Sequence, residues 1–144
     1  MKRLSFFILV VFHYSVWAAD IIFSKGDIAV NGYDVVAYHT EAKAIKGDKK
    51  YSHHWNDVDW HFSSKKNRDA FKKSPSRYAP QYGGFCAFAV SKGSLAPTDP
   101  HAWTIYKGKL YLNYSKAVRT TWKKDIDAHI QRADKNWPRL NKAR

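Results

Sequence analysis

Cys86 is the only cysteine in the chain, and its thiol offers the softest metal ligand in the sequence. A thiolate combined with imidazole nitrogens binds copper or zinc, and three-ligand sites of this composition are established chemistry for both metals. Four histidines are candidates to join it: His53, His54, His61 and His101. Because one cysteine cannot form a disulfide within the chain, Cys86 is expected to be free, buried, a metal ligand, or paired with another molecule.

A predicted β-hairpin decides which of these histidines can meet Cys86. Apolar and polar residues alternate over 50–54 and again over 58–63, on either side of a short polar turn, which is the pattern of two antiparallel strands. Along the first strand this alternation places His53 on the inward face and turns His54 to the outward face. One strand therefore cannot bring both histidines to the same site without a bulge.

The sequence predicts a copper or zinc site formed by Cys86 and His53, with His101 as a further candidate ligand. His61 faces outward by the same alternation and is expected at the surface, as is His54. The alternative is structural: free cysteine is among the most buried residue types, so Cys86 is then a small core residue and His53 a hydrogen-bonded core histidine.

Cys86 belongs to a stretch, residues 78–87, that concentrates adjacent glycines and three aromatic residues around the thiol. Gly83 and Gly84 permit positive φ and the close approach of another chain segment, which a residue with a Cβ would resist. We expect a buried turn beside Cys86.

Aromatic residues make up 16% of the chain, which suggests a second kind of site. A pocket walled by aromatic rings binds small apolar or aromatic molecules, although core packing accounts for the same residues. The aromatic side chains that we expect at such a pocket are Tyr33, Tyr38, Trp55, Trp60, Tyr82 and Phe85.

Short hairpins interleaved with helices predict an α+β fold: a small antiparallel sheet of hairpins, packed with two or more helices, and a long C-terminal helix. The remaining expected elements are a strand or short helix at 33–38, a helix at 65–73 with an N-cap offered by Ser63-Ser64 and ended by Pro75, a short helix or buried strand at 85–90, a loop at 93–100, a hairpin at 103–114, and a helix from Lys116 to about Lys135. The chain beyond Trp137-Pro138 is expected to fray.

The first eighteen residues follow the plan of a secretory signal: a basic start, an apolar run over 4–12 and small residues before a cut after Ala18. The apolar run is too short for a transmembrane helix, which needs about 20 residues. We therefore expect a periplasmic or secreted protein with one domain over 19–144, whose core spans about 28–138, and with no membrane span after cleavage.

The net charge of +13 favours anionic partners, such as a component of the cell envelope. Nucleic acid is not favoured, because export argues against it and no nucleic-acid-binding signature appears. The sequence also lacks a Walker loop and a Gly-x-Gly-x-x-Gly motif, and a Cys/His nucleophilic pair would need residues distant in sequence to meet. An enzymatic role is therefore not favoured.

Several motifs, taken in order, resemble the YHS domain family and most closely its stand-alone exported bacterial members. The segments that carry the resemblance cover nearly all of the chain after the signal: 31–38, 51–55, 60–64, 67–71, 75–86, 99–104, 110–114 and 136–138. The resemblance implies metal binding, notably of copper, which the family is proposed to achieve through cysteines. In this sequence Asn31 stands where the metal-linked members have a cysteine, and Ser63 and Asn67 stand where they often have further cysteines.

Overall fold

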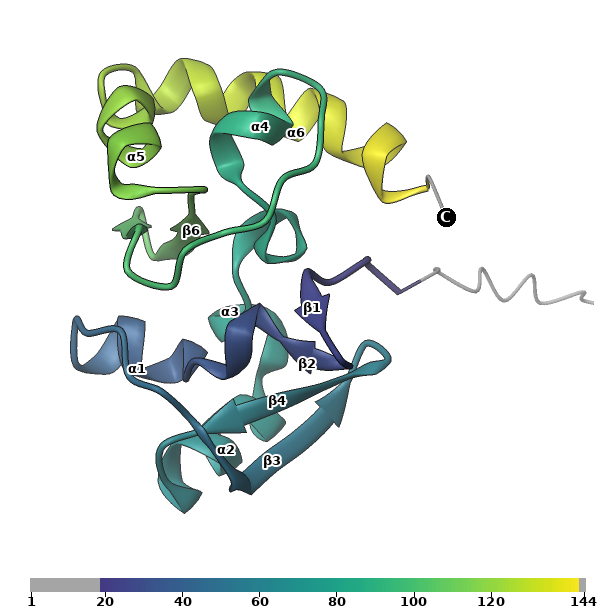
Figure 1. Cartoon of the computed structure of the whole chain (residues 1–144), viewed down its shortest axis with the longest axis vertical. Helices are drawn as coiled ribbons and strands as arrows, with labels where there is room; N and C mark the ends of the chain where they lie inside the picture. Colours follow the sequence, from purple (N-terminus) through teal and green to yellow (C-terminus); the bar gives the residue numbers. More distant parts are fainter. Residues whose placement is uncertain (1–18, 143–144) are drawn as a thin grey trace, which may run out of the picture.

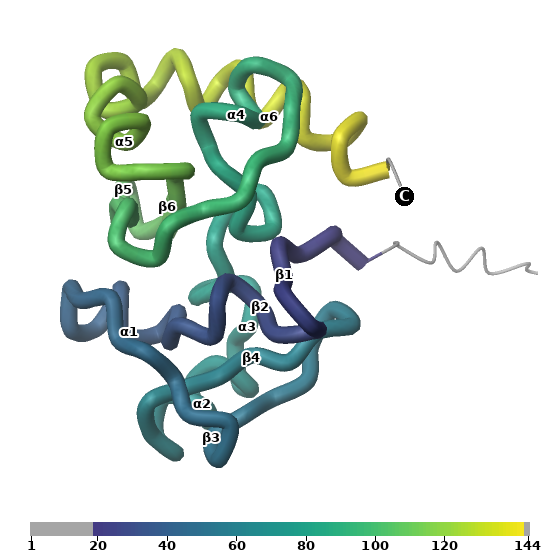
Figure 2. Tube along the Cα trace, viewed as in Figure 1, coloured from purple at the N-terminus to yellow at the C-terminus, as the bar shows by residue number. Residues whose placement is uncertain are grey.

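The computed structural model describes residues 19–142, so the predicted signal peptide lies outside the described residues. The chain forms two layers of elements (Figure 1). The first part, up to about residue 78, builds a small sheet with helices beside it. The segment that follows crosses to the second part, where helices cover a hairpin (Figure 2). The stretch around Cys86 therefore lies where the two parts meet.

The first part contains four strands and three α-helices. The sheet order is β1-β2-β4-β3; β1 and β3 lie at its edges, and α2 packs against β3 and β4. The elements are β1 (Ser24–Lys25), β2 (Ile28–Ala29), a 3-10 turn η1 (Val30–Gly32), α1 (Val35–Thr40), β3 (Asp48–Trp55), β4 (Val58–Phe62), α2 (Lys65–Lys73) and α3 (Pro75–Tyr78).

The second part contains a hairpin and three α-helices. Its longest helix, α6, packs along α4, and α5 contacts both of them. The elements are a 3-10 turn η2 (Gln81–Gly84), α4 (Ala87–Ser91), β5 (Trp103–Tyr106), β6 (Lys109–Leu112), α5 (Lys116–Lys123) and α6 (Ile126–Asn141).

The fold is α+β, as the sequence predicted, and the long C-terminal helix is present as α6. The larger sheet differs from the expectation in one respect, because it is mixed rather than purely antiparallel. β2 pairs in parallel with β4 through Ile28 and Asp59, whereas the other strand pairs are antiparallel. β2 lies beside β4 on the side away from β3, and η1, α1 and β3 separate the two strands along the chain, so no hairpin turn forces them to be antiparallel.

The predicted hairpin at 50–63 is confirmed as β3 and β4. His53 pairs with Trp60 and Trp55 with Val58, so the connection is Asn56-Asp57. Both turn residues have positive φ, 51° and 62°, which matches the right-handed twist of the strands. Because side chains alternate along β4, one face of this strand packs in the core, where Trp60 is 1% exposed.

Of the two elements expected at 33–38, a strand or a short helix, the structure has the helix, and Asp34 caps it. Its Oδ1 accepts hydrogen bonds from the backbone N–H groups of Val36 (2.9 Å) and Ala37 (3.1 Å), which caps α1. Its Oδ2 accepts from the Ser63 N–H and hydroxyl and from the Asn67 amide, at 2.6–2.8 Å. This fully buried carboxylate therefore ties α1 to the end of β4 and the start of α2.

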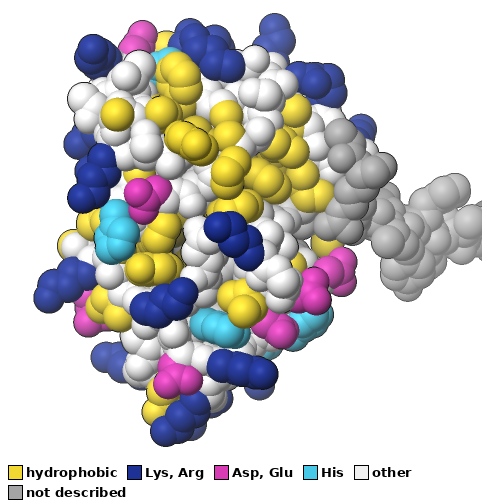
Figure 3. Space-filling model, viewed as in Figure 1, with side chains coloured by type: hydrophobic (Ala, Val, Ile, Leu, Met, Phe, Trp, Pro, Cys, Tyr) yellow, Lys and Arg dark blue, Asp and Glu magenta, His cyan; other side chains and the backbone are white. Residues whose placement is uncertain are grey.

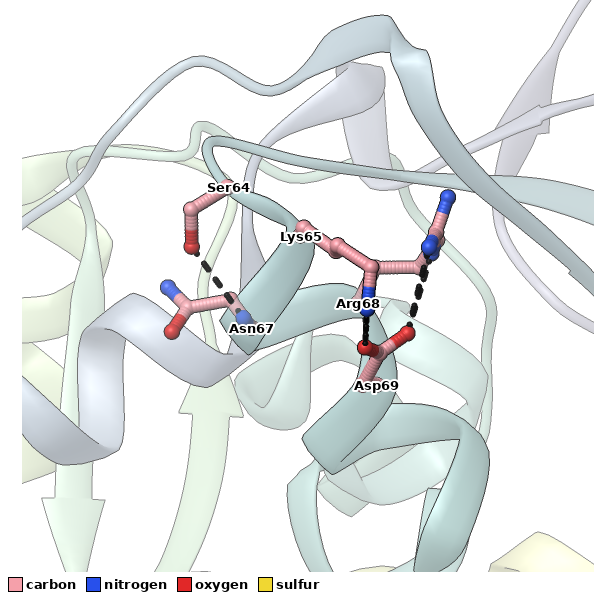
Figure 4. Close-up of polar contacts among 5 residues, drawn as sticks. All are labelled: Ser64, Lys65, Asn67, Arg68 and Asp69. Atoms are coloured by element: carbon pink, nitrogen blue, oxygen red, sulfur yellow. Dashed lines mark hydrogen bonds and ion pairs between the residues drawn. The ribbon is translucent and has the colours of Figure 1, made fainter.

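The helix at 65–73 is confirmed as α2, and of the two serines expected to offer its cap, Ser64 is the one that does so. Ser64 Oγ accepts the Asn67 N–H at 3.1 Å, and Asp69 forms ion pairs with Lys65 and Arg68 on the outer face (Figure 4). These exposed pairs contribute little to stability, because solvent screens them. The burial of Phe71 against Trp60 and Phe62, with ring centroids 5.0 Å apart in both pairs, holds the helix to the sheet.

Two left-handed turns lie at the centre of the molecule. In the first, Val30, Asn31 and Gly32 have φ of 43°, 60° and 74°; in the second, Tyr82, Gly83 and Gly84 have φ of 58°, 62° and 80°. A Cβ on Gly83 would collide with the carbonyl oxygen of Ile21, so the expected close approach at the paired glycines is confirmed. The chain after residue 20 is thereby held against the turn, and the Phe23 N–H donates to the Gly83 carbonyl at 2.8 Å.

The single helix expected from Lys116 to about Lys135 is wrong, because the structure has α5 and α6 with a break at Asp125. This residue has non-helical φ and ψ of −153° and 67°. The break allows Trp122 to reach the core from α5 while α6 runs along α4. The expected fraying after Pro138 is also wrong, since α6 continues to Asn141 and buries Leu140.

The described core has two clusters of buried residues. One lies between the larger sheet, α1 and α2 and includes Trp60, Phe62 and Phe71. The other lies beneath α4, α5 and α6 and includes Tyr82, Tyr111 and Trp122. Phe85, one residue before Cys86, packs against both clusters.

Candidate functional site

Cys86 is buried between η2 and β6, with 1% of its surface exposed. Its S–H points to Asn113 Oδ1 at 3.5 Å, and its Sγ accepts the Tyr114 N–H at 3.2 Å. Its backbone N–H donates to the Ala96 carbonyl at 3.0 Å. The thiol is therefore enclosed by main chain and by one amide side chain.

Asn113 connects this thiol to α4. Its Oδ1 also accepts the Phe88 N–H at 3.1 Å, and the side chain is fully buried. Its Nδ2 has no hydrogen-bond partner among the described residues. An unpaired buried amide hydrogen is unfavourable by about 1–3 kcal/mol, so this corner of the core carries a polar mismatch beside the cysteine.

His53 lies on the inward face of β3, as the alternation predicted. On that face its neighbour is α2 and not Cys86. Its ring meets Phe71 edge-on, with centroids 6.2 Å apart. Burial lowers the pKa of His53, and the positive charge of Lys72 acts in the same direction. Both effects favour the neutral form of the imidazole, which is the form that binds metals.

His101 is exposed in the loop before β5, and its Nε2 lies 3.5 Å from the Tyr33 hydroxyl. Cys86, His53 and His101 thus have three different sets of neighbours. Within residues 19–142, no three side chains of His, Cys, Asp or Glu form a group able to hold a metal ion. Metal binding by the predicted residues stays a prediction.

At two of the positions where the resemblance to YHS domains implies cysteine, this chain has a polar residue that forms hydrogen bonds within the fold. Ser63 and Asn67 both donate to Asp34, so their side chains complete the hydrogen bonding of a buried carboxylate. The third, Asn31, donates from Nδ2 to the Thr98 carbonyl at 3.0 Å. All three polar side chains are used in holding segments of the fold together.

A cleft of about 370 Å³ opens where β3 ends, η2 turns and α6 passes. We call it the aromatic cleft. Its walls include Trp55, Tyr82 and Trp137, and the Tyr82 and Trp137 rings meet at a centroid distance of 5.9 Å. The described residues that line it are Asp20, Ile22, Trp55, Asn56, Ser76, Ala79, Pro80, Gln81, Tyr82, Gly83, Asp134, Trp137 and Pro138.

Tyr82 is buried at this cleft and its hydroxyl has a hydrogen-bond partner. Its hydroxyl donates to Asp134 Oδ1 at 2.8 Å, and its side chain is 5% exposed. Burial and the acceptor Asp134 raise the pKa of Tyr82 far above its ordinary value, so the hydroxyl stays a donor. Its left-handed backbone is uncommon for a residue with a side chain, and such strain gathers at functional sites.

The charge of the aromatic cleft is opposite to that of the chain. The chain has 25 Lys and Arg residues against 12 Asp and Glu, yet none of the described residues lining the cleft is Lys, Arg or His. Asp20 and Asp134 both line it and both reach solvent. A carboxylate accepts about four hydrogen bonds, so Asp134 retains acceptor capacity beyond its bond to Tyr82.

The six aromatic residues predicted for a pocket are distributed over different environments. Trp55 and Tyr82 line the aromatic cleft, and Phe85 packs behind it against Trp137 at 6.5 Å. Tyr38 and Trp60 are each 1% exposed in the core. Tyr33 meets His101 edge-on at 5.7 Å, and no described pocket brings all six together.

Asp134 and Trp137 were not among the residues that sequence reasoning selected for a site. They lie three residues apart on α6 and so share a helix face. The sequence offered one signal for them, an acidic residue shortly before Trp-Pro in a basic C-terminal segment. This signal does not indicate a binding site until the structure shows that α6 packs near η2.

The surface around these elements is basic in general. Lys and Arg side chains are scattered over the face seen in Figure 3, and hydrophobic side chains gather in its upper half. None of the helices within residues 19–142 combines the length and apolar character that a membrane crossing requires. Comparisons of the chain with protein-family models, curated proteins and solved structures found no match.

Proposed function

We propose that this protein is a binding domain that holds a small, positively charged molecule with an apolar body in the aromatic cleft. The observation that carries the proposal is the pairing of three aromatic walls with two carboxylates in a cleft whose described lining residues include no basic side chain. An ammonium group near the face of Trp or Tyr gains about 0.5–2 kcal/mol, and a carboxylate beside it adds Coulomb attraction. Cys86 is then a structural residue, which agrees with its burial.

The proposal is tested with benzyltrimethylammonium as the probe, titrated into the isotope-labelled domain and followed by NMR. The indole N–H signals of Trp55 and Trp137 should shift with saturation, because both rings line the cleft. Trp137→Leu removes one ring and should weaken binding about three- to tenfold. Shifts confined to residues outside the cleft would contradict the proposal.

Asp134→Asn keeps the size of the side chain and removes its charge. It should weaken probe binding about two- to fivefold, as expected for an exposed charge pair. The matched control is Asp127→Asn on the same helix, whose carboxylate pairs with Tyr106 and Lys107 and does not line the cleft. Equal weakening in both variants would indicate attraction by overall charge and would count against a site.

A second proposal follows from the YHS resemblance: the protein binds copper or zinc through Cys86, with His53 and His101 as candidate ligands. Its support is that Cys86 is a free thiol. The test is titration of reduced, metal-free protein with Cu(I) and with Zn²⁺, beside Cys86→Ser. Stoichiometric binding that is lost in the folded variant supports it, and equal behaviour of both proteins overturns it.

A further inference from the structure

A second hollow, of about 450 Å³, lies beside the left-handed turn 30–32 and shares no lining residue with the aromatic cleft. We call it the Gly32 pocket. Three basic side chains reach it, and none of the described residues that line it is acidic. Its lining consists of Lys25, Ile28, Asn31, Gly32, Lys46 and His61.

Gly32 marks the point at which these side chains converge. The place that a Cβ on Gly32 would occupy is 3.6 Å from His61 Nδ1, 3.7 Å from Lys46 Nζ and 3.4 Å from Ile28 Cγ2. Gly32 is buried and has φ of 74°, so a residue with a side chain would be strained there and would fill this point. The missing side chain leaves an ammonium and an imidazole nitrogen within 4 Å of one small space.

Lys46 is held in place at both ends, unlike a typical surface lysine. Its backbone forms a bridge with Tyr33, and the neighbouring Gly47 N–H donates to the Gly32 carbonyl at 2.8 Å. Its Nζ donates to the Asn31 carbonyl at 2.8 Å and lies 5.2 Å from the centre of the Tyr33 ring. An ammonium has three N–H donors, so two remain for a ligand.

The turn that shapes this pocket is strained. Val30 has φ of 43°, which is an outlier for a β-branched residue, and Asn31 and Gly32 continue the left-handed path. Backbone strain of this kind persists only where the surrounding structure enforces it, and it is found preferentially at functional sites. In this turn the left-handed backbone places the Asn31 carbonyl beside Lys46. It also turns the side of Gly32 that lacks a Cβ toward His61.

We propose that the Gly32 pocket binds a small oxyanion of the phosphate type. Lys46 and His61 would donate hydrogen bonds to its oxygens, Lys25 would add charge from β1, and Ile28 would contact an apolar substituent. This inference is independent of ligand binding in the aromatic cleft. The same chemistry is offered by a free phosphate and by a phospholipid headgroup, and the test separates these two sources.

The experiment uses inorganic phosphate as the probe, titrated into the labelled domain at low ionic strength with chloride as the competing-anion control. Amide signals of Gly32, Lys46 and His61 should shift to saturation. Lys46→Gln and His61→Gln should each weaken binding about tenfold, the effect of one charge-assisted hydrogen bond. Lys43→Gln, an exposed lysine of the same loop that does not line the pocket, should change it less than about twofold.

Vesicles of phosphatidylglycerol and of phosphatidylcholine form the second arm. Loss of vesicle binding in Lys46→Gln but not in Lys43→Gln assigns the site to an anionic headgroup, whereas saturable phosphate binding without vesicle binding assigns it to a free oxyanion. Equal loss in Lys46→Gln and Lys43→Gln, or no saturable shift at Gly32, overturns the proposal. His61→Gln leaves the Lys46 contacts intact, so it keeps the test valid if Lys46→Gln does not fold.

Discussion

The side chain of Val30 occupies the space that a Cβ on Gly84 would need. Each residue belongs to one of the two left-handed turns, and the contact of Val30 Cγ1 with the Gly84 Cα face packs one turn against the other. The aromatic cleft is lined by the second turn and the Gly32 pocket by the first. Both proposed sites therefore depend on this contact for their shape.

Gly84→Ala should destabilise the protein by about 1–2 kcal/mol for the left-handed backbone and about 1–3 kcal/mol more for overpacking against Val30. Gly108→Ala is the matched control, because its φ of 77° is close to the 80° of Gly84 and nothing lies within 4 Å of its Cβ position. Urea unfolding of both variants separates backbone strain from packing.

Combining Gly84→Ala with Val30→Ala gives the decisive comparison. Because Val30 fills the space that the new methyl group needs, the loss of stability caused by Gly84→Ala should fall toward that of Gly108→Ala when Val30→Ala is also present. An unchanged cost of Gly84→Ala in the two backgrounds would show that the turns do not press on each other.

Asp34→Ala should be among the most damaging single changes in the first part of the chain. It removes the cap of α1, worth about 0.5–2 kcal/mol, and leaves the donors of Ser63 and Asn67 without their acceptor, at about 1–3 kcal/mol each. We expect a loss of at least about 3 kcal/mol in unfolding free energy. Asp59→Asn breaks only the exposed pair with His54 and should change it by less than about 1 kcal/mol, measured in the same way.

Local sequence patterns predicted the first part of the fold well because its elements are set by near neighbours. The Ser63-Ser64 pair and the alternation around Asn56-Asp57 are signals that act over three or four residues, and α2, β3 and β4 were predicted from them. The break at Asp125 has no such signal. Trp122 and Ile126 keep a four-residue helical spacing across it, so only the packing of α6 along α4 produces the bend.

The sites were predicted less well, because their residues come from distant segments. The aromatic cleft is lined by residues near positions 20, 55, 80 and 135. Of these, only Trp55 and Tyr82 were predicted as pocket residues, because they are aromatic. Asp134 becomes part of a site only through its bond to Tyr82, 52 residues away. Cys86 was correctly placed beside a buried turn, since the adjacent glycines and the thiol are neighbours in sequence.

Stability should fall as the pH decreases below about 6.5, the ordinary pKa of histidine. Burial lowers the pKa of His39, His53 and His129 in the folded protein, so the unfolded chain binds protons first and folding loses free energy. The stabilising contribution of these neutral imidazoles is complete above pH 6.5 and is lost as the pH falls through their folded-state pKa values.

His129→Gln should reduce this pH dependence, measured as unfolding free energy between pH 7.5 and 5, because it removes one neutral imidazole that contacts Ser91 and Arg132. His101→Gln, at an exposed position, serves as the control. A steeper loss of stability in His129→Gln than in the unchanged protein would contradict the assignment.

Cys86 should resist alkylation in the folded protein. Because its sulfur is buried and hydrogen-bonded, iodoacetamide should reach it only through opening of the structure, at a rate at least about 100-fold below that in denaturant. Mass spectrometry of timed samples gives both rates. Labelling of the native protein at the denatured rate would show an accessible thiol and would strengthen the metal proposal.

The most direct test of the proposed function is a calorimetric comparison of three probes that share a benzyl group and differ in charge: benzyltrimethylammonium, benzyl alcohol and phenylacetate. The cation should bind most tightly and phenylacetate most weakly, although the protein as a whole is strongly positive. Asp134→Asn should reduce the difference in affinity between the cation and phenylacetate. Tighter binding of phenylacetate than of benzyltrimethylammonium would contradict the proposal that the aromatic cleft recognises a cation.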